Sequence, residues 1–401
     1  MPEGWELVKL SDIAVSELGK TLDKGKNSGT PRNYLCAFNV KWCSFDLSVI
    51  KKILLEDEEL ERYRVRKGDL LICEGGDVGR AAIWESDQDI YYQNALHRVR
   101  FEDEISQYFY LYVLQYYKSL GMIDDVSGGV TIKHFTQNSM KKLCFPFPPI
   151  AEQKRIVSAI KQWFALIDTL ETAKEDLQTS IAQAKSKILD LAIHGKLVPQ
   201  DPNDEPAIEL LKRINPNFTP CDNAHYPFDV PNNWIWTKGL DIFKPMKTTS
   251  PLGDTFKYID IDAIDNKRNV ITSVKVLSTK QAPSRASRYT EKGCVLFSMV
   301  RPYLRNIAVV SENDCIASTG FFVCQAESCL SPKYCYYLML SNYVVDGLNN
   351  FMKGDNSPSI TKAQIESFIF PLPPDNEQLR IVAKIEELSA VLDEIQKSIE
   401  A

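Results

Sequence analysis

Apolar residues recur along two long segments of the chain at alternating steps of four and three, the heptad pattern of a helix that packs against another helix. The first seam comprises Ile156, Ile160, Trp163, Ile167, Leu170, Leu177, Ile181, Ala184, Ile188 and Leu191, with Lys174 at one seam position. The second comprises Ile381, Ile385, Leu388, Leu392, Ile395 and Ile399. Because about forty residues without Gly or Pro exceed a typical globular helix, two long paired helices are favoured over an amphipathic helix lying on its own domain.

Both helices are preceded by nearly the same sequence. Residues 145–157 read FPFPPIAEQKRIV, and residues 370–382, 225 positions later, read FPLPPDNEQLRIV. The Pro pair cannot lie inside a helix and so marks its start, and Glu152 and Glu377 fall in the first turn, where the helix dipole favours an anion. The pattern therefore predicts two helices that begin in the same way.

The repeat extends over both halves of the chain. Trp5 and Trp234 each open a strand-and-turn pattern with Lys and Asp-Ile at the same spacing. The paired segments that follow predict a β-hairpin (67–84 and 292–309), an aromatic helix that serves packing (108–120 and 334–345) and a polar Gly-rich loop (127–134 and 353–362). The Gly-rich turn at 75–80 lacks the GxxxxGK[ST] order of a phosphate-binding loop, so a plain turn is favoured over a nucleotide site.

These patterns predict five segments. They are a first domain (1–149), a central long helix (150–195), a linker with a short helix at 207–214 (196–230), a second domain (231–373) and a C-terminal helix (374–401). His194-Gly195 is a plausible helix stop, and the Pro-rich run at 199–206 is typical of a linker.

Charge is distributed unevenly along the chain. The net charge of −6 argues against binding nucleic acid by overall charge. However, residues 20–52 and residues 280–305 each carry a local balance of +5, in stretches punctuated by Gly, Pro, Ser or Thr. Such stretches suit exposed loops that contact an anionic partner, although a solvated face without a partner is an equally good interpretation of each stretch alone.

Metal, cofactor and membrane chemistry are disfavoured. The ten cysteines form no CxxC pair, and His97, His134, His194 and His225 lie far from ligand-like spacing, so free buried thiols are expected rather than zinc or disulfides. We find no secretion signal and no run of eighteen apolar residues, so we expect a cytoplasmic protein with no cofactor and no membrane contact.

The motif PPxxEQxxRIV in both halves, together with GKLVPQDPNDEP at 195–206, resembles the specificity subunit of type I restriction-modification enzymes over essentially the full chain. The resemblance implies an α+β fold: two repeated target recognition domains separated by two long antiparallel coiled-coil helices, with approximate two-fold symmetry. It implies a non-catalytic reader of a bipartite double-stranded DNA target. Two methyltransferase subunits would dock on the helices and restriction subunits outside them.

The residues agree that catalysis lies elsewhere. Asn215-Pro-Asn-Phe218 is not the Asn-Pro-Pro-Tyr signature of an adenine methyltransferase, and Glu152-Gln-Lys154 belongs to a helix start rather than a nuclease site. The alternative function is a pseudo-symmetric scaffold that has lost DNA reading, and basic loops at equivalent places in both halves favour the reader over it. An enzyme with an unfamiliar active site is the weakest hypothesis.

The expected DNA-binding residues lie in the basic or Gly-rich loops of the two halves. In the first half they are Lys20, Lys24, Lys26, Arg32, Gly76, Gly79, Arg80, Gln93, Asn94, Arg98, Thr131, Lys133 and His134. In the second half they are Lys247, Arg285, Arg288, Arg301, Tyr303, Arg305, Lys353, Ser357 and Lys362. The expected helix and subunit interface is the pair of seams, including Lys174.

One expectation concerns an uncovered stretch of seam. Matching the helices by the 225-residue offset pairs Ile399 with Lys174, so Leu177 to Leu191 is expected to lack an intramolecular partner. Either the chain has lost its end or another subunit covers that stripe, which would otherwise favour self-association.

Overall fold

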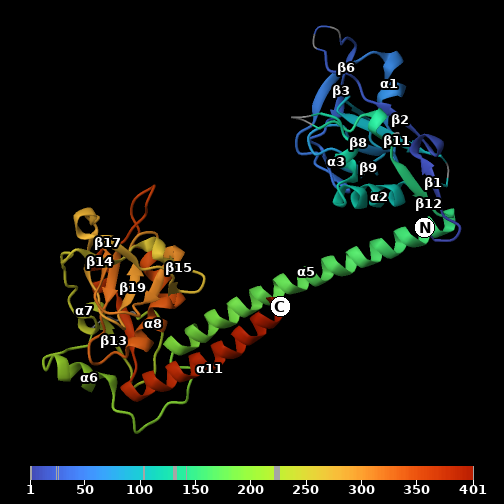
Figure 1. Cartoon of the computed structure of the whole chain (residues 1–401). Coiled ribbons are helices and arrows are strands. Elements are labelled where there is room, and N and C mark those ends of the chain that lie inside the picture. Colours follow the sequence, from blue (N-terminus) through green and yellow to red (C-terminus); the bar gives the residue numbers. More distant parts are fainter. Residues whose placement is uncertain are drawn as a thin grey trace. The chain divides into compact units, whose positions relative to one another are not determined.

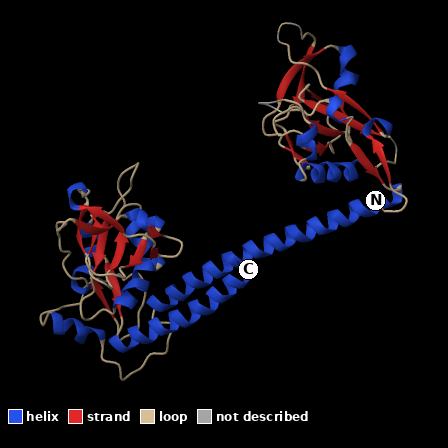
Figure 2. Cartoon of the chain, viewed as in Figure 1, coloured by secondary structure: helices blue, strands red, loops and turns tan. Residues whose placement is uncertain are grey.

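A computed structural model describes residues 2–23, 25, 27–102, 104–129, 133–140, 142–220 and 226–400. The chain forms two compact units, unit 1 (Met1–Glu171) and unit 2 (Thr172–Ala401), each combining strands with helices (Figures 1 and 2). The predicted contacts at Lys24, Lys26 and Thr131 lie outside the described residues, as does His225.

Unit 1 holds two four-stranded sheets. One has the order β6 (Lys51–Leu55), β3 (Thr30–Leu35), β10 (Ile90–Tyr92), β7 (Arg64–Val65), and the other β2 (Ala14–Leu18), β11 (Leu96–Phe101), β8 (Leu70–Cys73), β9 (Ala81–Ile83). Two short pairs accompany them: β1 (Glu6–Lys9) with β12 (Cys144–Phe147), and β4 (Val40–Lys41) with β5 (Ser44–Phe45). The helices are α1 (Asp57–Tyr63), α2 (Gln107–Ser119), α3 (Met122–Val126) and α4 (Gln137–Met140).

Unit 2 repeats this plan. Its sheets have the orders β17 (Lys275–Ser278), β14 (Thr255–Ile259), β21 (Cys315–Ser318), β18 (Ala286–Tyr289), and β20 (Ile307–Val309), β19 (Val295–Ser298), β22 (Phe321–Cys324). The short pairs are β13 (Ile235–Lys238) with β23 (Ile369–Leu372) and β15 (Ile264–Asp265) with β16 (Val270–Ile271). The helices are α6 (Ala207–Ile214), α7 (Gly239–Ile242), α8 (Pro332–Leu340), α9 (Asn342–Asn349) and α10 (Lys362–Ser367).

Both predicted hairpins are confirmed. β8 pairs with β9 in unit 1, and β19 pairs with β20 in unit 2, each antiparallel. All four residues of β8 and of β19 are buried, because each strand packs on both faces. The closing strands also correspond, since Lys9 faces Cys144 in unit 1 and Lys238 faces Ile369 in unit 2.

The aromatic helix predicted at 108–120 is confirmed as α2, but the one predicted at 334–345 is two helices, α8 and α9. The break falls at Ser341, whose backbone is extended and whose hydroxyl accepts from the backbone N–H of Val344, which caps α9. A serine side chain that bonds to the backbone at a helix start favours a break over a continuous helix. The apolar spacing alone did not reveal the break at Ser341.

The two long helices are α5 (Ile150–Ile193) and α11 (Asp375–Glu400). Within unit 2 they run antiparallel: Ala192 and Ile193 at the end of α5 share a core with Ile381 and Ile385 near the start of α11. Earlier in α5, the Lys185 ammonium lies 2.6 Å from a carboxylate oxygen of Asp393, late in α11.

This pairing corrects the expectation for the uncovered seam. The C-terminal part of α5 is covered, with Ile181 buried and Ile188 packed against the core of unit 2, whereas residues 161–177 are exposed throughout. The offset of 225 relates residues that occupy equivalent places in the repeat. An antiparallel pair instead joins the start of one helix to the end of the other, so the stretch without a partner is the earlier one.

Candidate nucleic-acid interface

The hairpin turn of unit 1 is joined to the Gly-rich loop that precedes α4. The backbone N–H of Phe135 donates to the carbonyl of Glu74 at 2.7 Å, and Gly128 and His134 exchange backbone hydrogen bonds of 3.1 and 2.7 Å. Gly79 has φ +82°, and a Cβ there would lie 2.7 Å from a side-chain carbon of Ile123, so only glycine fits. Backbone hydrogen bonds therefore join the hairpin turn to the described residues of the Gly-rich loop.

Unit 2 builds the same pair of loops with the same hydrogen bonds, 225 positions later. The backbone N–H of Ile360 donates to the carbonyl of Met299 at 2.9 Å, and Lys353 and Ser359 exchange backbone bonds of 3.1 and 3.0 Å. The backbone N–H of Arg301 also donates to the carbonyl of Pro358 at 2.8 Å. Each unit thus holds a hairpin turn against a second, polar loop.

Arginine replaces glycine at two left-handed positions of the unit 2 turn, Arg301 (φ 48°) and Arg305 (φ 55°). Non-glycine residues adopt this conformation at a cost, which side-chain contacts offset here. Arg301 donates to the carbonyl of Asn356 at 2.9 Å and remains exposed. Arg305 donates to the carbonyl of Leu340 at 2.8 Å and to the Asn342 side chain at 2.6 Å, so it ties the turn to α9.

The remaining predicted residues of unit 2 lie mostly at its surface. Lys247, Arg285, Tyr303, Lys353 and Ser357 are exposed, and Arg288 is half-buried. Lys247 lies over the Tyr289 ring, and Lys362 lies 3.1 Å from the Glu366 carboxylate. Exposed cations near polar loops suit phosphate contact.

In unit 1, Arg98 is buried, and its side chain joins neighbouring parts of the unit. Its guanidinium donates to the carbonyls of Arg62 and Arg64, at 3.1 and 2.6 Å, and pairs with Glu17. A buried arginine with these partners ties strand β11 to the segment around β7, so its place in the fold favours a positioning role over DNA contact.

Other predicted cations of unit 1 are partly engaged. Lys20 pairs with Glu59, whose carboxyl pKa this hydrogen bond lowers, and Arg80 donates to the carbonyl of Ala37 at 2.9 Å. Lys133 donates to the carbonyl of Asp124 at 3.0 Å. His134 is exposed at the loop pair, while Arg32, Gly76, Gln93 and Asn94 lie at partly or fully exposed positions.

Sequence reasoning missed the glutamine of each repeated motif. Gln153 and Gln378 are fully buried. Gln153 accepts from the backbone N–H of Ser106 and donates to the carbonyl of Pro148, and Gln378 makes the equivalent bonds to Ser331 and Pro373. The repeated Glu-Gln pair was visible, but the hydrogen-bond partners of the glutamines lie up to 49 residues away and could not be inferred from it.

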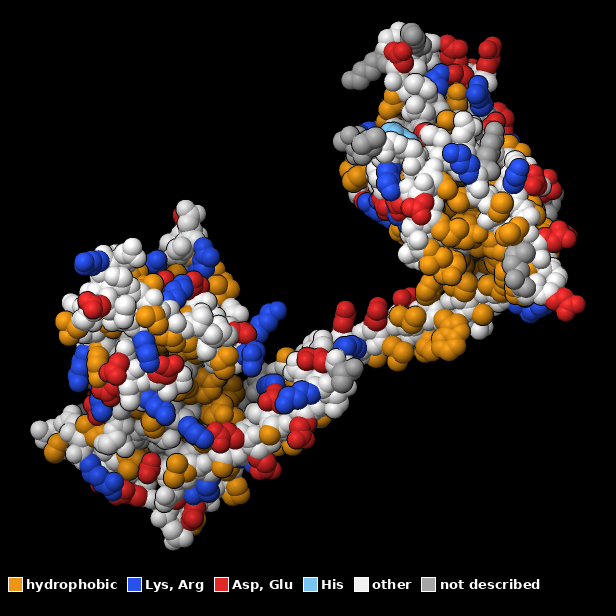
Figure 3. Space-filling model, in the orientation of Figure 1, with side chains coloured by type: hydrophobic (Ala, Val, Ile, Leu, Met, Phe, Trp, Pro, Cys, Tyr) orange, Lys and Arg blue, Asp and Glu red, His pale blue; other side chains and the backbone are white. Residues whose placement is uncertain are grey.

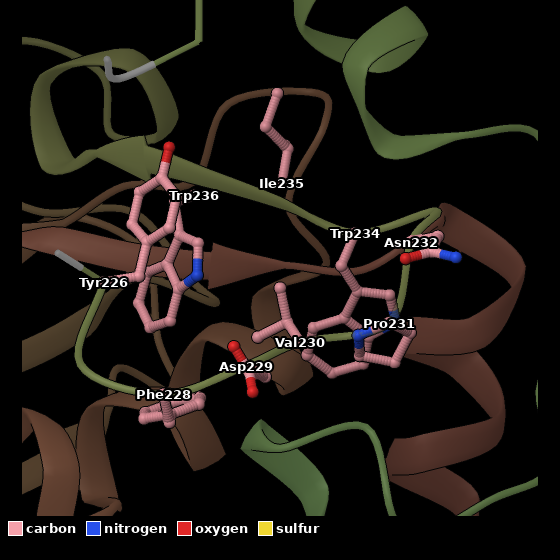
Figure 4. A pocket seen from close by; sticks show the side chains of 9 residues that line it. All are labelled: Tyr226, Phe228, Asp229, Val230, Pro231, Asn232, Trp234, Ile235 and Trp236. Atoms are coloured by element: carbon pink, nitrogen blue, oxygen red, sulfur yellow. The ribbon is translucent and has the colours of Figure 1, made fainter. Parts of the chain in front are cut away.

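A cavity of about 270 Å³ lies elsewhere in unit 2, beside β13 (Figure 4). Tyr226, Phe228 and Trp236 line it, and Asp229 is the one charged side chain among the described residues that line it. Tyr226 stacks on Trp236, Phe228 meets Trp236 edge-on, and the His194 ring stacks on Phe228 with ring centroids 3.8 Å apart. This aromatic cluster packs the linker against the unit, and its His194 ring lies 3.3 Å from a carboxylate oxygen of Asp190, one helical turn earlier in α5.

The described residues contain no group of three His, Cys, Asp or Glu side chains placed to hold a metal ion. Six of the nine described cysteines are buried and free, and burial raises the pKa of Cys73 to about 11 and of Cys329 to about 12. Such thiols are poor nucleophiles at neutral pH. No helix among the described residues is long and apolar enough to cross a membrane.

Comparison with known proteins gives consistent matches. The model of the type I restriction modification DNA specificity domain matches residues 2–179 and 255–401. The EcoAI specificity subunit of Escherichia coli is 25% identical over 61% of this chain and 52% of its own length, so the chain spans about half of that relative. The EcoEI specificity subunit of E. coli is 23% identical over 100% of this chain and 80% of that subunit.

A solved structure shares the fold. The HsdS subunit from Thermoanaerobacter tengcongensis superposes with a TM-score of 0.61 at 18% identity, covering 99% of this chain and 92% of that one. The fold predicted from the repeat is therefore confirmed.

Proposed function

The chain belongs to the type I restriction-modification DNA specificity family, and we propose that it acts as the specificity subunit of such an enzyme. Unit 1 reads one half of a bipartite double-stranded DNA target and unit 2 reads the other. The subunit carries no catalytic site of its own and needs no cofactor. It docks methyltransferase and restriction subunits, which supply the chemistry, and it works in the cytoplasm.

The observation that carries this proposal is that equivalent backbone hydrogen bonds join the hairpin turn to the polar loop in both units. The bonds from Phe135 to Glu74 and from Ile360 to Met299 occupy equivalent positions, so each hairpin turn is tied to its neighbouring loop in the same way. Rigid loops on a sheet are suited to recognition, because little conformational entropy is lost on binding.

The predicted contacts with bases and the predicted contacts with phosphates fall to different residues. Exposed donors at the loop pairs are the candidates for reading bases: His134 in unit 1, and Arg301, Tyr303 and Ser357 in unit 2. Exposed lysines, including Lys133 and Lys353 in these loops and Lys247 beside Tyr289, are candidates for phosphate contact. Arg98 and Arg305 position the loops and sheets from within.

The net charge of −6 should lower the affinity of this chain alone for DNA. A subunit with a net negative charge gains little from long-range attraction to DNA, so its own phosphate contacts are local and its partner subunits supply others. Affinity for DNA should therefore be higher in the assembled enzyme than for this chain alone.

The experiment that tests the proposal is methylome sequencing of cells that carry this chain with its cognate methyltransferase subunit. A bipartite methylated motif is expected. Exchanging residues 1–145 for those of a relative should change one half of that motif and leave the other half and the spacer intact. A change in both halves would contradict the division of labour, and absence of any motif would contradict the function.

A further inference from the structure

A turn at residues 36–43 of unit 1 lies against the hairpin that β8 and β9 form. The Arg80 guanidinium, at the end of the hairpin turn, donates to the carbonyl of Ala37 at 2.9 Å. The backbone N–H of Cys43 donates to the carbonyl of Ala81, at the start of β9, at 3.1 Å. The 36–43 turn is therefore a direct neighbour of the hairpin turn that we assign to DNA reading.

The buried Asn39 bonds this turn to the loop that follows it. Its side-chain oxygen accepts from the backbone N–H of Cys36 at 3.0 Å. Its side-chain nitrogen donates to the carbonyls of Asp46 and Val49, each at 2.9 Å. The backbone N–H of Asn39 also donates to the carbonyl of Cys36 at 2.9 Å. Hydrogen bonds thus define the backbone on both sides of Phe38.

Phe38 presents an aromatic ring at the surface of this turn. The residue is 55% exposed, and the Lys41 ammonium lies over the ring, 4.7 Å from its centroid. An apolar ring beside a cation matches the two kinds of surface that DNA offers, because base edges include an apolar methyl group and the backbone carries anionic phosphates.

Further cations lie close to the turn. Lys51 and Lys52 are exposed on β6, paired with β3, the strand that leads into the turn. Among residues 36–52 the one carboxylate is that of Asp46, which accepts hydrogen bonds from Ser48. On the face of unit 1 seen in Figure 3, Lys and Arg side chains are scattered among acidic and apolar ones. Contact with an anion therefore depends on local sets of cations such as this one.

Unit 2 has different chemistry at the equivalent turn. Strands β3 and β14 occupy equivalent places in their sheets, and β4 and β15 begin at the same distance after them. Counted from the ends of β3 and β14, Phe38 corresponds to Asp262, whose carboxylate pairs with Lys275 at 2.7 Å. Lys41 corresponds in the same way to Asp265. Two carboxylates repel phosphates, so this turn of unit 2 is unsuited to the same contact.

We propose that Phe38 contacts the C5-methyl group of a thymine in the major groove of the half-site that unit 1 reads, and that Lys41 contacts a neighbouring phosphate. This inference rests on the proposed function and adds a specificity-determining residue to it. A phenyl ring has no hydrogen-bonding group, and the thymine methyl is the apolar group that base pairs present in the major groove. The ring therefore favours a T·A pair at one position.

The test uses the full chain assembled with its cognate methyltransferase subunit and a duplex that carries the motif found by methylome sequencing. Each thymine of the unit 1 half-site is replaced in turn by uracil, which removes only the methyl group. At one position the unchanged enzyme should bind the uracil duplex about fourfold more weakly. Phe38→Ala should bind the thymine duplex at least as weakly and should bind both duplexes equally.

Two further variants separate the roles of the ring and the cation. Lys41→Ala should weaken binding to the thymine and uracil duplexes by the same factor, because a phosphate contact carries no base information. Phe38→Asp combined with Lys41→Asp, which copies unit 2, should weaken binding by about tenfold or more, because it puts like charges together. In every variant, uracil in the unit 2 half-site should have the effect that it has in the unchanged enzyme.

The matched control is Val15→Ala. Val15 is 64% exposed, and it pairs with Arg100 near the end of β11 that is remote from the hairpin turn. This variant also shortens an exposed apolar side chain of unit 1, and it should bind the thymine duplex normally and keep the preference over uracil.

Three results would overturn the inference: no thymine of the half-site shows the dependence on its methyl group, Phe38→Ala keeps the preference for thymine, or Phe38→Ala and Val15→Ala bind alike. If no methylated motif is found at all, the proposed function fails and this contact fails with it, so the two failures are distinguished. Circular dichroism of each variant establishes that it is folded, so loss of binding is not mistaken for unfolding.

Discussion

Gln378 offers the sharpest test of how the repeated motif holds each unit together. Its side-chain oxygen accepts from the backbone N–H of Ser331 at 2.7 Å, and its nitrogen donates to the carbonyls of Cys329 and Pro373 at 2.9 and 3.1 Å. Gln378→Leu keeps a similar volume but leaves one N–H and two carbonyls buried without this partner. A stranded buried polar group costs about 1–3 kcal/mol, so we expect a loss of about 3 kcal/mol in the stability of unit 2.

Gln153→Leu makes the equivalent change in unit 1, where two bonds are lost instead of three, so about 2 kcal/mol is expected. Gln396→Leu, which removes an exposed bond to Glu400, is the control and should change stability by less than about 0.5 kcal/mol. Urea unfolding with hydrogen exchange resolved by peptide reports each unit separately. The reasoning fails if Gln378→Leu leaves exchange in unit 2 unchanged, or if it destabilises unit 1 instead.

Three further predictions concern reading, spacing and pH. Arg301→Ala should weaken recognition at one base of the unit 2 half-site by about 1–3 kcal/mol. The control is Lys397→Ala, which removes an exposed charge late in α11 and should leave the recognised motif intact. Competition binding with single-base variants of the target measures both effects. If the length of α5 sets the spacing between the two half-sites, inserting four helical residues after Glu171, within its exposed stretch, should add about 6 Å and about 40° of rotation. Methylation should then shift to a spacer altered by one or two base pairs or fail, and full activity at the original spacer would show that α5 does not set the spacing. Burial lowers the pKa of His97 from 6.5 to about 4, so as pH falls the unfolded chain binds a proton before the folded chain does. The stability of unit 1 should therefore fall by up to about 3 kcal/mol between pH 6.5 and pH 4. Unfolding curves measured across that range should show a smaller dependence on pH for His97→Gln.

The sequence alone determined the parts of this protein that depend on local pattern. The short helix predicted at 207–214 is α6, and both hairpins and the start of both long helices occur where the Gly, Pro and apolar spacing placed them. These features depend on turns, caps and periodicity within a few residues. The repeat then indicated that the two halves share one fold, because the same local signals recur in the same order.

Tertiary structure alone decided which side chains are available. Arg98 and Arg301 are both basic residues predicted to contact DNA, yet Arg98 is buried against carbonyls more than thirty residues away, while Arg301 remains at the surface. Likewise, the heptads showed two seams, but only the antiparallel packing of α5 on α11 showed that the earlier part of α5 is the open one. Contacts between residues distant in sequence leave no periodic signal, so charge and spacing could list these candidates but could not sort them.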